Sequence, residues 1–187
     1  MIKRSFDFLL AFLSLFVFGL PIIITAIFVK ISSKGPIFFW SDRIGKGGAN
    51  YRMPKFRSMR IDAPQLATHL LENPQQWLTP IGSFLRKSSL DELPQLWSIL
   101  KGDMSFVGPR PALFNQDDLI QLRKNAGIDA LMPGLTGWAQ VNGRDELSIP
   151  DKVKLDAEYL VRQSLRFDCY ILWLTFLKVL SKDGVSH

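Results

Sequence analysis

Cysteine and histidine are scarce in this sequence of 187 residues, which contains one cysteine and two histidines. The single Cys169 excludes an internal disulfide, and its position in an apolar run predicts a buried side chain with a structural role. Because one histidine, His187, is the terminal residue, the nitrogen and sulfur ligands of a zinc site are missing. Any metal is therefore expected to be a hard cation held by carboxylate and phosphate oxygens.

Acidic residues are fewer than basic ones, at 17 against 23, and the net charge is +6. This excess suits nucleic acid, anionic lipid or phosphorylated substrates, and by itself it does not choose among them. The sequence also lacks internal repeats and low-complexity tracts. Its length and a hydrophobic content of 47% predict one folded domain with an additional anchor.

Charge is absent between Phe8 and Val29, a run long enough, at about 1.5 Å per helical residue, to cross a bilayer core of roughly 30 Å. Pro21 inside this run removes a helical hydrogen bond, so a bend is expected there. A re-entrant helix, which bends and returns within one leaflet, is preferred over a straight span, because a span would leave one basic flank on the wrong side of the membrane. The flanking basic residues are Lys3, Arg4, Lys30 and Lys34.

The sequence after this run predicts an α+β fold that is mostly helical. Residues 36–40 and 51–56 flank a glycine-rich turn and predict a small β-hairpin. Residues 151–165 predict an exposed helix, in which Asp156, Glu158 and Tyr159 could face either a functional site or water.

The apolar residues 167–180 are too few to span a membrane, and they predict an amphipathic helix at the membrane interface. We expect a membrane-anchoring helix at residues 1–34 and a folded domain at residues 35–187.

Two adjacent carboxylates, Asp91 and Glu92, lie where a helix is expected to begin. Ser89 and Glu92 match a capping box, in which the serine caps the helix and the glutamate reaches back to it. This box accounts for Glu92 but not for Asp91. Pro94 makes the helix start irregular, a cost that functional sites tolerate more often than plain scaffolds do. Asp91 is therefore the stronger candidate for chemistry.

Basic residues and glycine-bearing loops accompany the two carboxylates. Arg110 lies between Pro109 and Pro111, which restrain the backbone and so lower the entropy lost when the guanidinium binds a phosphate. A glycine-rich segment, 132–144, ends in Arg144 and could bring backbone amides close to an anion. Surface turns, solvated basic edges and cations that complement a helix dipole are the ordinary alternatives. The other basic candidates are Lys55, Arg57 and Arg86.

Five motifs follow one another along the chain. They are Lys55-Phe56-Arg57-Ser58-Met59, Arg86-Lys87-Ser88-Ser89-Leu90-Asp91-Glu92-Leu93-Pro94-Gln95, Lys101-Gly102-Asp103-Met104-Ser105, Gly108-Pro109-Arg110-Pro111, and Pro133-Gly134-Leu135-Thr136-Gly137 through Asn142-Gly143-Arg144. In this order they resemble the bacterial sugar transferases, the monotopic polyprenyl-phosphate phosphoglycosyl transferases of small catalytic-unit type. The resemblance runs from about Lys3 to Lys182. It departs from the family at Leu20, since many relatives carry serine before the helix-breaking proline.

The resemblance implies transfer of a sugar 1-phosphate from a nucleotide sugar, usually a UDP-sugar, to a polyprenyl phosphate such as undecaprenyl phosphate, with release of UMP. It implies Mg²⁺ as cofactor and a monotopic enzyme at the cytoplasmic face of the bacterial inner membrane, with residues 35–187 as the cytoplasmic catalytic domain. Such reactions start the assembly of O-antigen and lipopolysaccharide, capsule, exopolysaccharide or glycoprotein. Nucleic acid is not an expected partner, and the sequence leaves the formation of a homo-oligomer open.

By this resemblance, Asp91 is the expected nucleophile, which attacks the phosphate next to the sugar and forms an aspartyl phosphosugar. Glu92 is expected either to bind metal or to remove a proton from the acceptor phosphate, and the Asp91 and Glu92 carboxylates are the expected protein ligands of Mg²⁺. The residues expected to hold substrate phosphates are Lys55, Arg57, Arg86, Arg110 and Arg144. The residues expected to shape the backbone are Pro21, Pro94, Pro109 and Pro111.

Two other functions are compatible with parts of this pattern. A non-catalytic membrane-bound adaptor would use the basic loops to hold anionic lipid or nucleic acid, with binding that weakens in salt. Hydrolysis of a lipid diphosphate would require water as the acceptor. The ordered carboxylates and phosphate-type loops favour the transferase over both, although no residue specifies which sugar is transferred.

Overall fold

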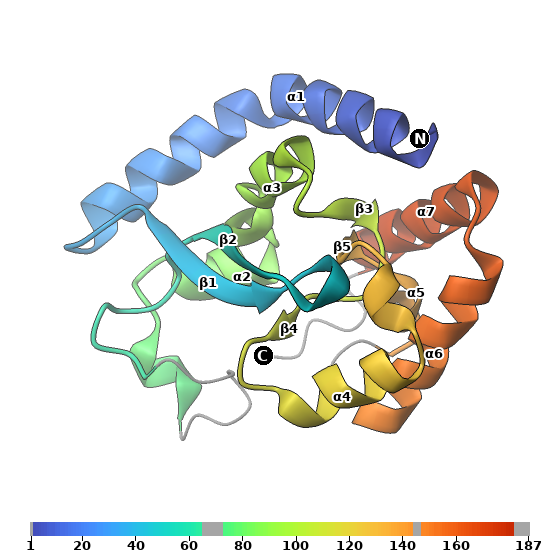
Figure 1. The fold of residues 1–187 in the computed structure, drawn as a ribbon. Coiled ribbons are helices and arrows are strands. Elements are labelled where there is room, and N and C mark those ends of the chain that lie inside the picture. The colour runs from blue at the N-terminus through green and yellow to red at the C-terminus, as the bar shows by residue number, and fades with distance from the viewer. Residues whose placement is uncertain (1, 65–72, 144–146, 182–187) are drawn as a thin grey trace.

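The computed structural model describes residues 2–64, 73–143 and 147–181 (Figure 1). The helices are α1 (Ile2–Ser32), α2 (Gly82–Lys87), α3 (Gln95–Lys101), α4 (Asp117–Asn125), α5 (Trp138–Val141), α6 (Ile149–Arg162) and α7 (Leu165–Ser181). The strands are β1 (Phe38–Ile44), β2 (Asn50–Phe56), β3 (Ser105–Val107), β4 (Ala112–Leu113) and β5 (Gly134–Thr136). Short 3-10 turns are η1 (Lys46–Gly48), η3 (Pro74–Trp77), η4 (Leu90–Glu92) and η5 (Ile128–Ala130). The predicted α+β fold with mostly helical content is confirmed.

Two small sheets connect the helices. β1 and β2 form the predicted antiparallel hairpin, and β4 extends it in the order β2-β1-β4. β3 and β5 pair in parallel as a separate sheet. Figure 1 shows α1 crossing above α3 and β3, while α6 and α7 gather at the side where the N-terminus lies.

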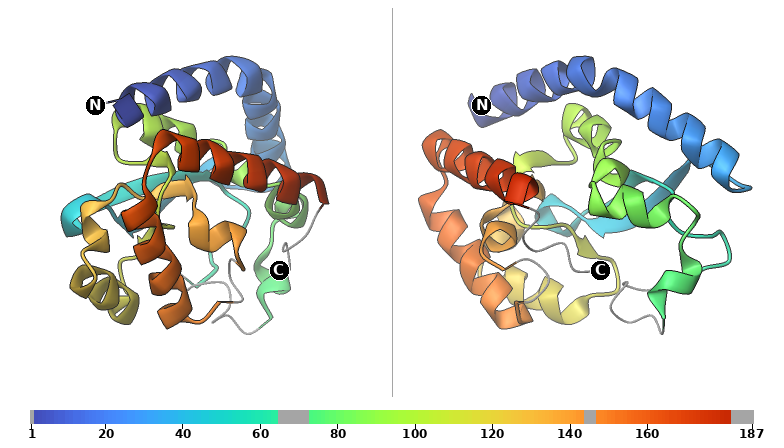
Figure 2. Two further views of the ribbon diagram at one scale, coloured as in Figure 1. Left: turned by 90° about the vertical axis from the view of Figure 1, so that its right-hand side faces the viewer. Right: turned by 180° about the vertical axis from the view of Figure 1, so that it is seen from behind.

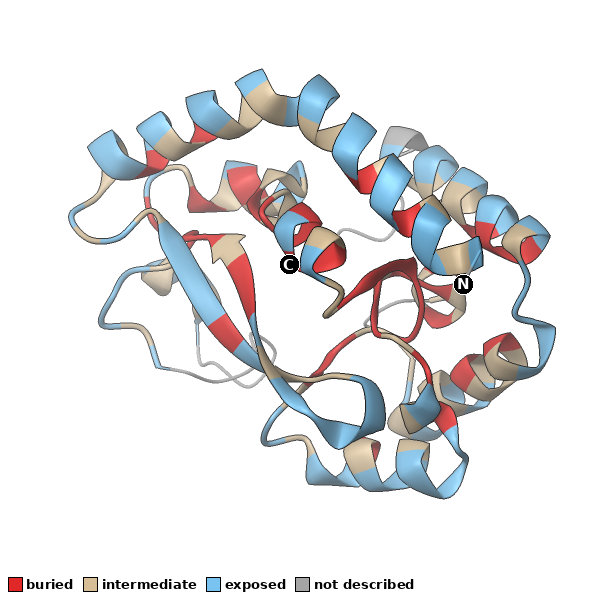
Figure 3. Ribbon diagram, turned by 45° about the horizontal axis from the view of Figure 1, so that its top comes forward, coloured by how far each residue is buried: buried red, intermediate tan, exposed pale blue. Residues whose placement is uncertain are grey.

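The helix α1 continues through Pro21 without interruption and curves over the rest of the molecule, as Figures 1 and 2 show. Ala11, Thr25 and Val29 are buried on its inner side. Most of its apolar side chains are exposed, and the exposed residues of α1 are coloured pale blue in Figure 3. Within the described ranges, α1 is the one helix long and apolar enough to cross a membrane. An apolar surface of this extent indicates contact with lipid or protein.

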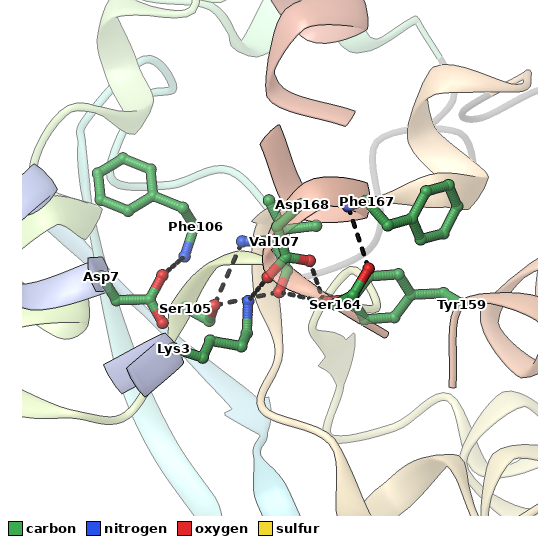
Figure 4. A network of polar contacts seen from close by, with 9 residues as sticks. All are labelled: Lys3, Asp7, Ser105, Phe106, Val107, Tyr159, Ser164, Phe167 and Asp168. Atoms are coloured by element: carbon green, nitrogen blue, oxygen red, sulfur yellow. Dashed lines mark hydrogen bonds and ion pairs between the residues drawn. The ribbon is translucent and has the colours of Figure 1, made fainter. Parts of the chain in front are cut away.

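A buried polar network attaches the N-terminal end of α1 to the body of the protein (Figure 4). Lys3 Nζ lies 2.6 Å from Asp168 Oδ2 on α7, and the Tyr159 hydroxyl donates to Asp168 Oδ1 at 2.7 Å. One helical turn after Lys3, the Asp7 carboxylate accepts a hydrogen bond from the backbone amide of Phe106 in β3 at 3.1 Å. The N-terminal half of α1 is thereby joined to β3, α6 and α7.

The last two helices differ from the sequence prediction at several side chains. Asp156 and Tyr159 of α6 face neither a site nor water, because both are buried, and Asp156 pairs with Arg123 of α4. The prediction that Cys169 is buried is wrong, since α7 turns Asp168 inward and leaves the thiol exposed. An apolar run alone does not specify which face of a helix meets the core.

The two glycine-bearing loops of the sequence meet in space, where their backbones approach closely. A Cβ atom on Gly134 would lie 2.2 Å from Gly108 N, and one on Gly137 would lie 2.1 Å from Gly108 O. Gly108 N donates to Thr136 O and Gly134 N donates to Pro109 O, each at 2.9 Å. Only glycine permits this contact, which holds the start of the arginine-bearing turn against β5.

Gly134→Ala is expected to lower the free energy of unfolding by about 3 kcal/mol, because the new methyl group would overlap the Gly108 backbone, which no side-chain rotation can relieve. Gly19→Ala is the matched control, since nothing lies within 4 Å of its Cβ position in α1. This control should be neutral or stabilising by up to about 1 kcal/mol. Denaturant unfolding of the purified protein in detergent measures both variants, and equal effects would contradict the close approach.

Candidate active site

The backbone between α2 and α3 turns sharply around the two central carboxylates. Ser89 has a left-handed conformation with φ of 56°, which is strained for a residue with a side chain, and the 3-10 turn η4 follows it. Pro94, with φ of −61°, then leads into α3. The capping box does not form: Ser89 makes no side-chain capping bond, and the Glu92 amide donates to the Ser89 carbonyl at 3.1 Å. The capping explanation of Glu92 is therefore wrong.

Asp91 is a buried carboxylate that accepts no hydrogen bond from any described residue, and it is only 8% exposed. The pKa of its carboxyl group is raised to about 6, chiefly by burial and also by the negative charge of Glu92. The positive charges of Lys55, Arg86 and Arg110 act in the opposite direction and keep this rise from being larger. Asp91 is thus mostly ionised at pH 7 and poorly solvated, two properties that suit a nucleophile.

Three other buried aspartates show how unusual this environment is. Asp7 accepts a hydrogen bond from a backbone amide, and Asp168 binds a lysine and a tyrosine. Asp156 accepts two hydrogen bonds from Arg123, at 3.0 and 2.7 Å. Such partners compensate a carboxylate for the loss of water. Among the described residues, Asp91 has only the field of nearby cations, so its oxygens remain available to a ligand.

Glu92 pairs with cations from two other parts of the fold. Lys55 Nζ, on β2, lies 2.8 Å from Glu92 Oε1, and Arg110 Nη2, on the turn after β3, lies 3.6 Å from the same oxygen. The side chains of Lys55 and Glu92 are each 17% exposed, so water screens their attraction only in part. The structure therefore brings together three residues that the sequence placed in the site.

Arg86 approaches Asp91 from the end of α2. Its Nε donates to Ser58 Oγ at 3.1 Å, and its charge is close enough to lower the pKa of Asp91. Burial lowers the pKa of Arg86, and the charge of Asp91 partly offsets this effect. Arg86 thus lies where it can favour the ionised form of Asp91.

Arg57 binds backbone carbonyls and does not line the pocket beside Glu92. It is buried, and its guanidinium donates to Pro36 O at 2.7 Å and to Ser33 O at 3.0 Å. These bonds tie the end of β2 to the segment after α1 and favour a structural role. Its contact with a substrate phosphate stays a prediction, and Arg144 lies outside the described residues.

Two polar side chains of that pocket were not among the site residues predicted from the sequence. Arg43, on β1, donates through Nε to Ser41 Oγ and through Nη1 to Pro111 O, each at 3.0 Å. Gln95 begins α3 and is only 3% exposed. Nothing local distinguishes them from an ordinary strand arginine or helix glutamine, so only tertiary contacts reveal them. The lining residues are Arg43, Met53, Lys55, Glu92, Gln95, Arg110, Pro111, Gly134 and Leu135.

The turn that carries Arg110 is held at both of its prolines. The Pro109 carbonyl accepts a hydrogen bond from Gly134 N at 2.9 Å, and the Pro111 carbonyl accepts one from Arg43 at 3.0 Å. The backbone on each side of Arg110 is therefore fixed by long-range hydrogen bonds as well as by the proline rings.

The carboxylates offer a partial site for Mg²⁺. Carboxylate oxygens are suitable hard ligands, and those of Asp91 accept no hydrogen bond from the described part of the chain, whereas Glu92 already binds Lys55. The described residues contain no group of three or more potential metal ligands. Substrate phosphate and water would complete the coordination, with Asp91 as the more available protein ligand.

Comparison with known proteins identifies the family of this chain. Residues 1–182 match the bacterial sugar transferase family, and the chain belongs to that family. It is 40% identical to the uncharacterized sugar transferase EpsL of Bacillus subtilis, over all of this chain and 91% of the relative. It is 36% identical to the exopolysaccharide production protein ExoY of Rhizobium meliloti, over 98% of this chain and 88% of the relative.

A longer relative in Escherichia coli is named UDP-glucose:undecaprenyl-phosphate glucose-1-phosphate transferase. The two chains are 39% identical over 186 residues, which represent 95% of this chain and 40% of the relative. This chain therefore spans less than half of that protein but most of EpsL and ExoY.

Asp91→Asn is expected to raise the free energy of unfolding at pH 7 by about 2 to 3 kcal/mol, because the native protein then no longer holds a poorly solvated charge. The folded pKa of about 6 lies above the ordinary value of 3.8, so the native state binds this proton more tightly than the unfolded state does. The contribution of Asp91 to stability therefore falls as pH rises from about 4 to about 6. Unfolding at pH 4 and pH 7 measures the difference.

The matched control is Asp168→Asn, which breaks the ion pair with Lys3 and should destabilise the protein by about 3 kcal/mol at pH 7. The free energy of unfolding at pH 7 is therefore expected to rise in Asp91→Asn and to fall in Asp168→Asn. A loss of stability in Asp91→Asn similar to that in Asp168→Asn would show that the fold compensates the Asp91 charge.

Proposed function

We propose that this protein transfers a sugar 1-phosphate from a UDP-sugar to undecaprenyl phosphate and releases UMP. The name of the Escherichia coli relative supports this reaction. A relative in Erwinia amylovora, 35% identical, is named UDP-galactose-lipid carrier transferase. Because these names differ in the hexose, the proposal specifies a UDP-sugar and no particular hexose. The observation that carries it is Asp91, a buried carboxylate without hydrogen bonds from the described residues, set among three cations.

The proposed reaction has two steps. In the first, an Asp91 oxygen attacks the phosphorus attached to the sugar, the bond from this phosphorus to the bridging oxygen breaks, and the electron pair leaves with UMP. In the second, an oxygen of undecaprenyl phosphate attacks the phosphorus of the aspartyl phosphosugar. The bond from this phosphorus to the Asp91 oxygen breaks, and its electron pair returns to the Asp91 carboxylate. A covalent intermediate allows two large substrates to react in turn at one nucleophile.

The surrounding side chains have complementary roles in this proposal. Lys55 and Arg110 stabilise negative charge on the phosphates, and Arg86 keeps Asp91 ionised. Glu92 holds Lys55 and Arg110 in position and either binds the metal or accepts a proton from the acceptor phosphate. Bound Mg²⁺ would neutralise the charge of the diphosphate and assist departure of the leaving group.

The apolar surfaces of two helices support a location at the membrane. α1 exposes most of its apolar side chains, and α7 exposes Tyr170, Trp173 and Phe176, aromatic residues that suit the headgroup region. Figures 1 and 2 show α7 near the N-terminal half of α1, so one bilayer could contact both helices. We propose a monotopic enzyme at the cytoplasmic face of the bacterial inner membrane.

Contacts at both ends of α1 support the re-entrant interpretation. At its start, Lys3 pairs with Asp168, and Arg4 donates to carbonyls at the end of α3. Just after its end, the carbonyls of Ser33 and Pro36 bind Arg57. A straight span would place the two ends on opposite sides of the membrane, whereas both ends contact the same body. This agrees with an anchor at residues 1–34 and a cytoplasmic domain at residues 35–187.

The protein is expected to release UMP from a suitable UDP-sugar and Mg²⁺ without any undecaprenyl phosphate, up to one equivalent of enzyme, because Asp91 itself accepts the phosphosugar. A panel of UDP-sugars with a sensitive UMP assay identifies the donor. The yield should fall as pH drops below about 6, since protonation removes the nucleophile.

Asp91→Asn should abolish this release, and Asp117→Asn, which alters an exposed carboxylate on α4, should retain it. UMP that forms only after lipid is added would contradict the covalent route. Binding that is sensitive to salt but independent of the sugar nucleotide, with no UMP under any condition, would instead favour the adaptor.

A further inference from the structure

Gln95 is a buried amide that lines the pocket beside Glu92 without using its donor. The residue is 3% exposed, and its Nε2 has no hydrogen-bond partner among the described residues. Buried donors are nearly always paired, because an unpaired one loses its bonds to water without replacement. At the first position of α3, the chain therefore carries a donor that the described fold does not satisfy.

Arg43 brings a second incompletely used donor to the same pocket. Its Nε and Nη1 bind Ser41 and Pro111, which fixes the direction of the guanidinium, while its Nη2 has no hydrogen-bond partner in the described part of the chain. Burial, as the larger cause, and the positive charge of Arg110 together lower the pKa of Arg43 to about 10. The guanidinium groups of Arg43 and Arg110 line the same pocket and repel each other, so binding of an anion there is favoured.

The charges of the pocket specify the class of ligand that it suits. Arg43, Lys55 and Arg110 supply three positive charges, against one negative charge from Glu92. Gln95 adds a neutral donor to these cations. A diphosphate carries two negative charges, and its non-bridging oxygens accept hydrogen bonds from both guanidinium and amide groups. An uncharged sugar or base would not compensate this excess of positive charge.

We propose that Arg43 and Gln95 bind the diphosphate of the nucleotide sugar, Arg43 through its guanidinium beside Arg110 and Gln95 through its amide nitrogen. This inference rests on the proposed function and adds two binding residues to its site. The same donors hold the phosphate of the leaving nucleotide as negative charge collects on it. The unpaired state of Gln95 follows, since its partner is a substrate oxygen.

Binding of UDP with Mg²⁺ to the full chain in detergent, measured by isothermal titration calorimetry, tests this inference. Gln95→Met keeps the size of the side chain but removes the donor, and it should weaken UDP binding about tenfold. Gln95→Glu and Arg43→Gln should weaken it about a hundredfold, because each reduces the positive charge of the pocket. Gln121→Met is the matched control, as Gln121 is exposed on α4, and it should bind UDP like the wild type.

Thermal unfolding separates binding from a purely structural role. A glutamine that supports the fold would lower the melting temperature when replaced by methionine. A glutamine with an unpaired donor should leave the melting temperature unchanged or raise it. Weaker UDP binding together with unchanged or increased stability in Gln95→Met supports the inference. Wild-type affinity in Gln95→Met and Arg43→Gln, or no UDP binding by the unaltered chain, overturns it.

The binding of UDP can be measured whether or not the protein turns over a UDP-sugar, so the two proposals can fail separately. If UDP-sugars yield no UMP while UDP binding depends on Arg43 and Gln95, the proposed function fails and the diphosphate site stands. If UMP forms normally and the variants bind UDP like the wild type, the proposed function stands and this inference fails.

Discussion

Burying a carboxylate costs free energy, because the charge loses its hydrogen bonds to water. The organisation of the protein depends on how this free energy is compensated at four buried aspartates. Asp7, Asp156 and Asp168 receive donors from elements distant in sequence, so each of them joins parts of the fold. Asp91 is also buried, but only the field of nearby cations compensates its charge within the described residues. At three positions the donors that compensate the buried charge also join parts of the fold, whereas at the fourth the described residues leave the carboxylate oxygens available to a ligand.

The helix α1 and the turn that carries Arg110 belong to one framework. Asp7 on α1 binds the backbone of β3, and β3 continues directly into the turn that carries Arg110. Glycine contacts then hold the beginning of that turn against β5. In the proposed enzyme, the position of α1 in the membrane would therefore also set the orientation of the site. A lipid acceptor and a soluble donor could meet there without a hinge between anchor and site.

Several parts of the fold and site were predictable because they depend on residues close in sequence. Two short segments that flank a glycine-rich turn predicted the hairpin, and the uncharged run predicted α1. The capping box failed, because a serine and a glutamate at the right spacing can form it only if neither has a better partner, and Glu92 binds Lys55 instead. Arg43 and Gln95 were missed, since their significance lies in contacts across the pocket.

The sequence by itself determined the local backbone preferences, the apolar character of α1 and the supply of carboxylates and cations near the central turn. It also distinguished Asp91, as the candidate for chemistry, from Glu92. The reason given for Glu92, a capping box, was incorrect. Only the tertiary structure decided which carboxylates are paired, which arginines support the backbone and which face a pocket. Desolvation and charge pairing depend on neighbours that folding brings together from distant parts of the chain, and no local pattern contains those neighbours.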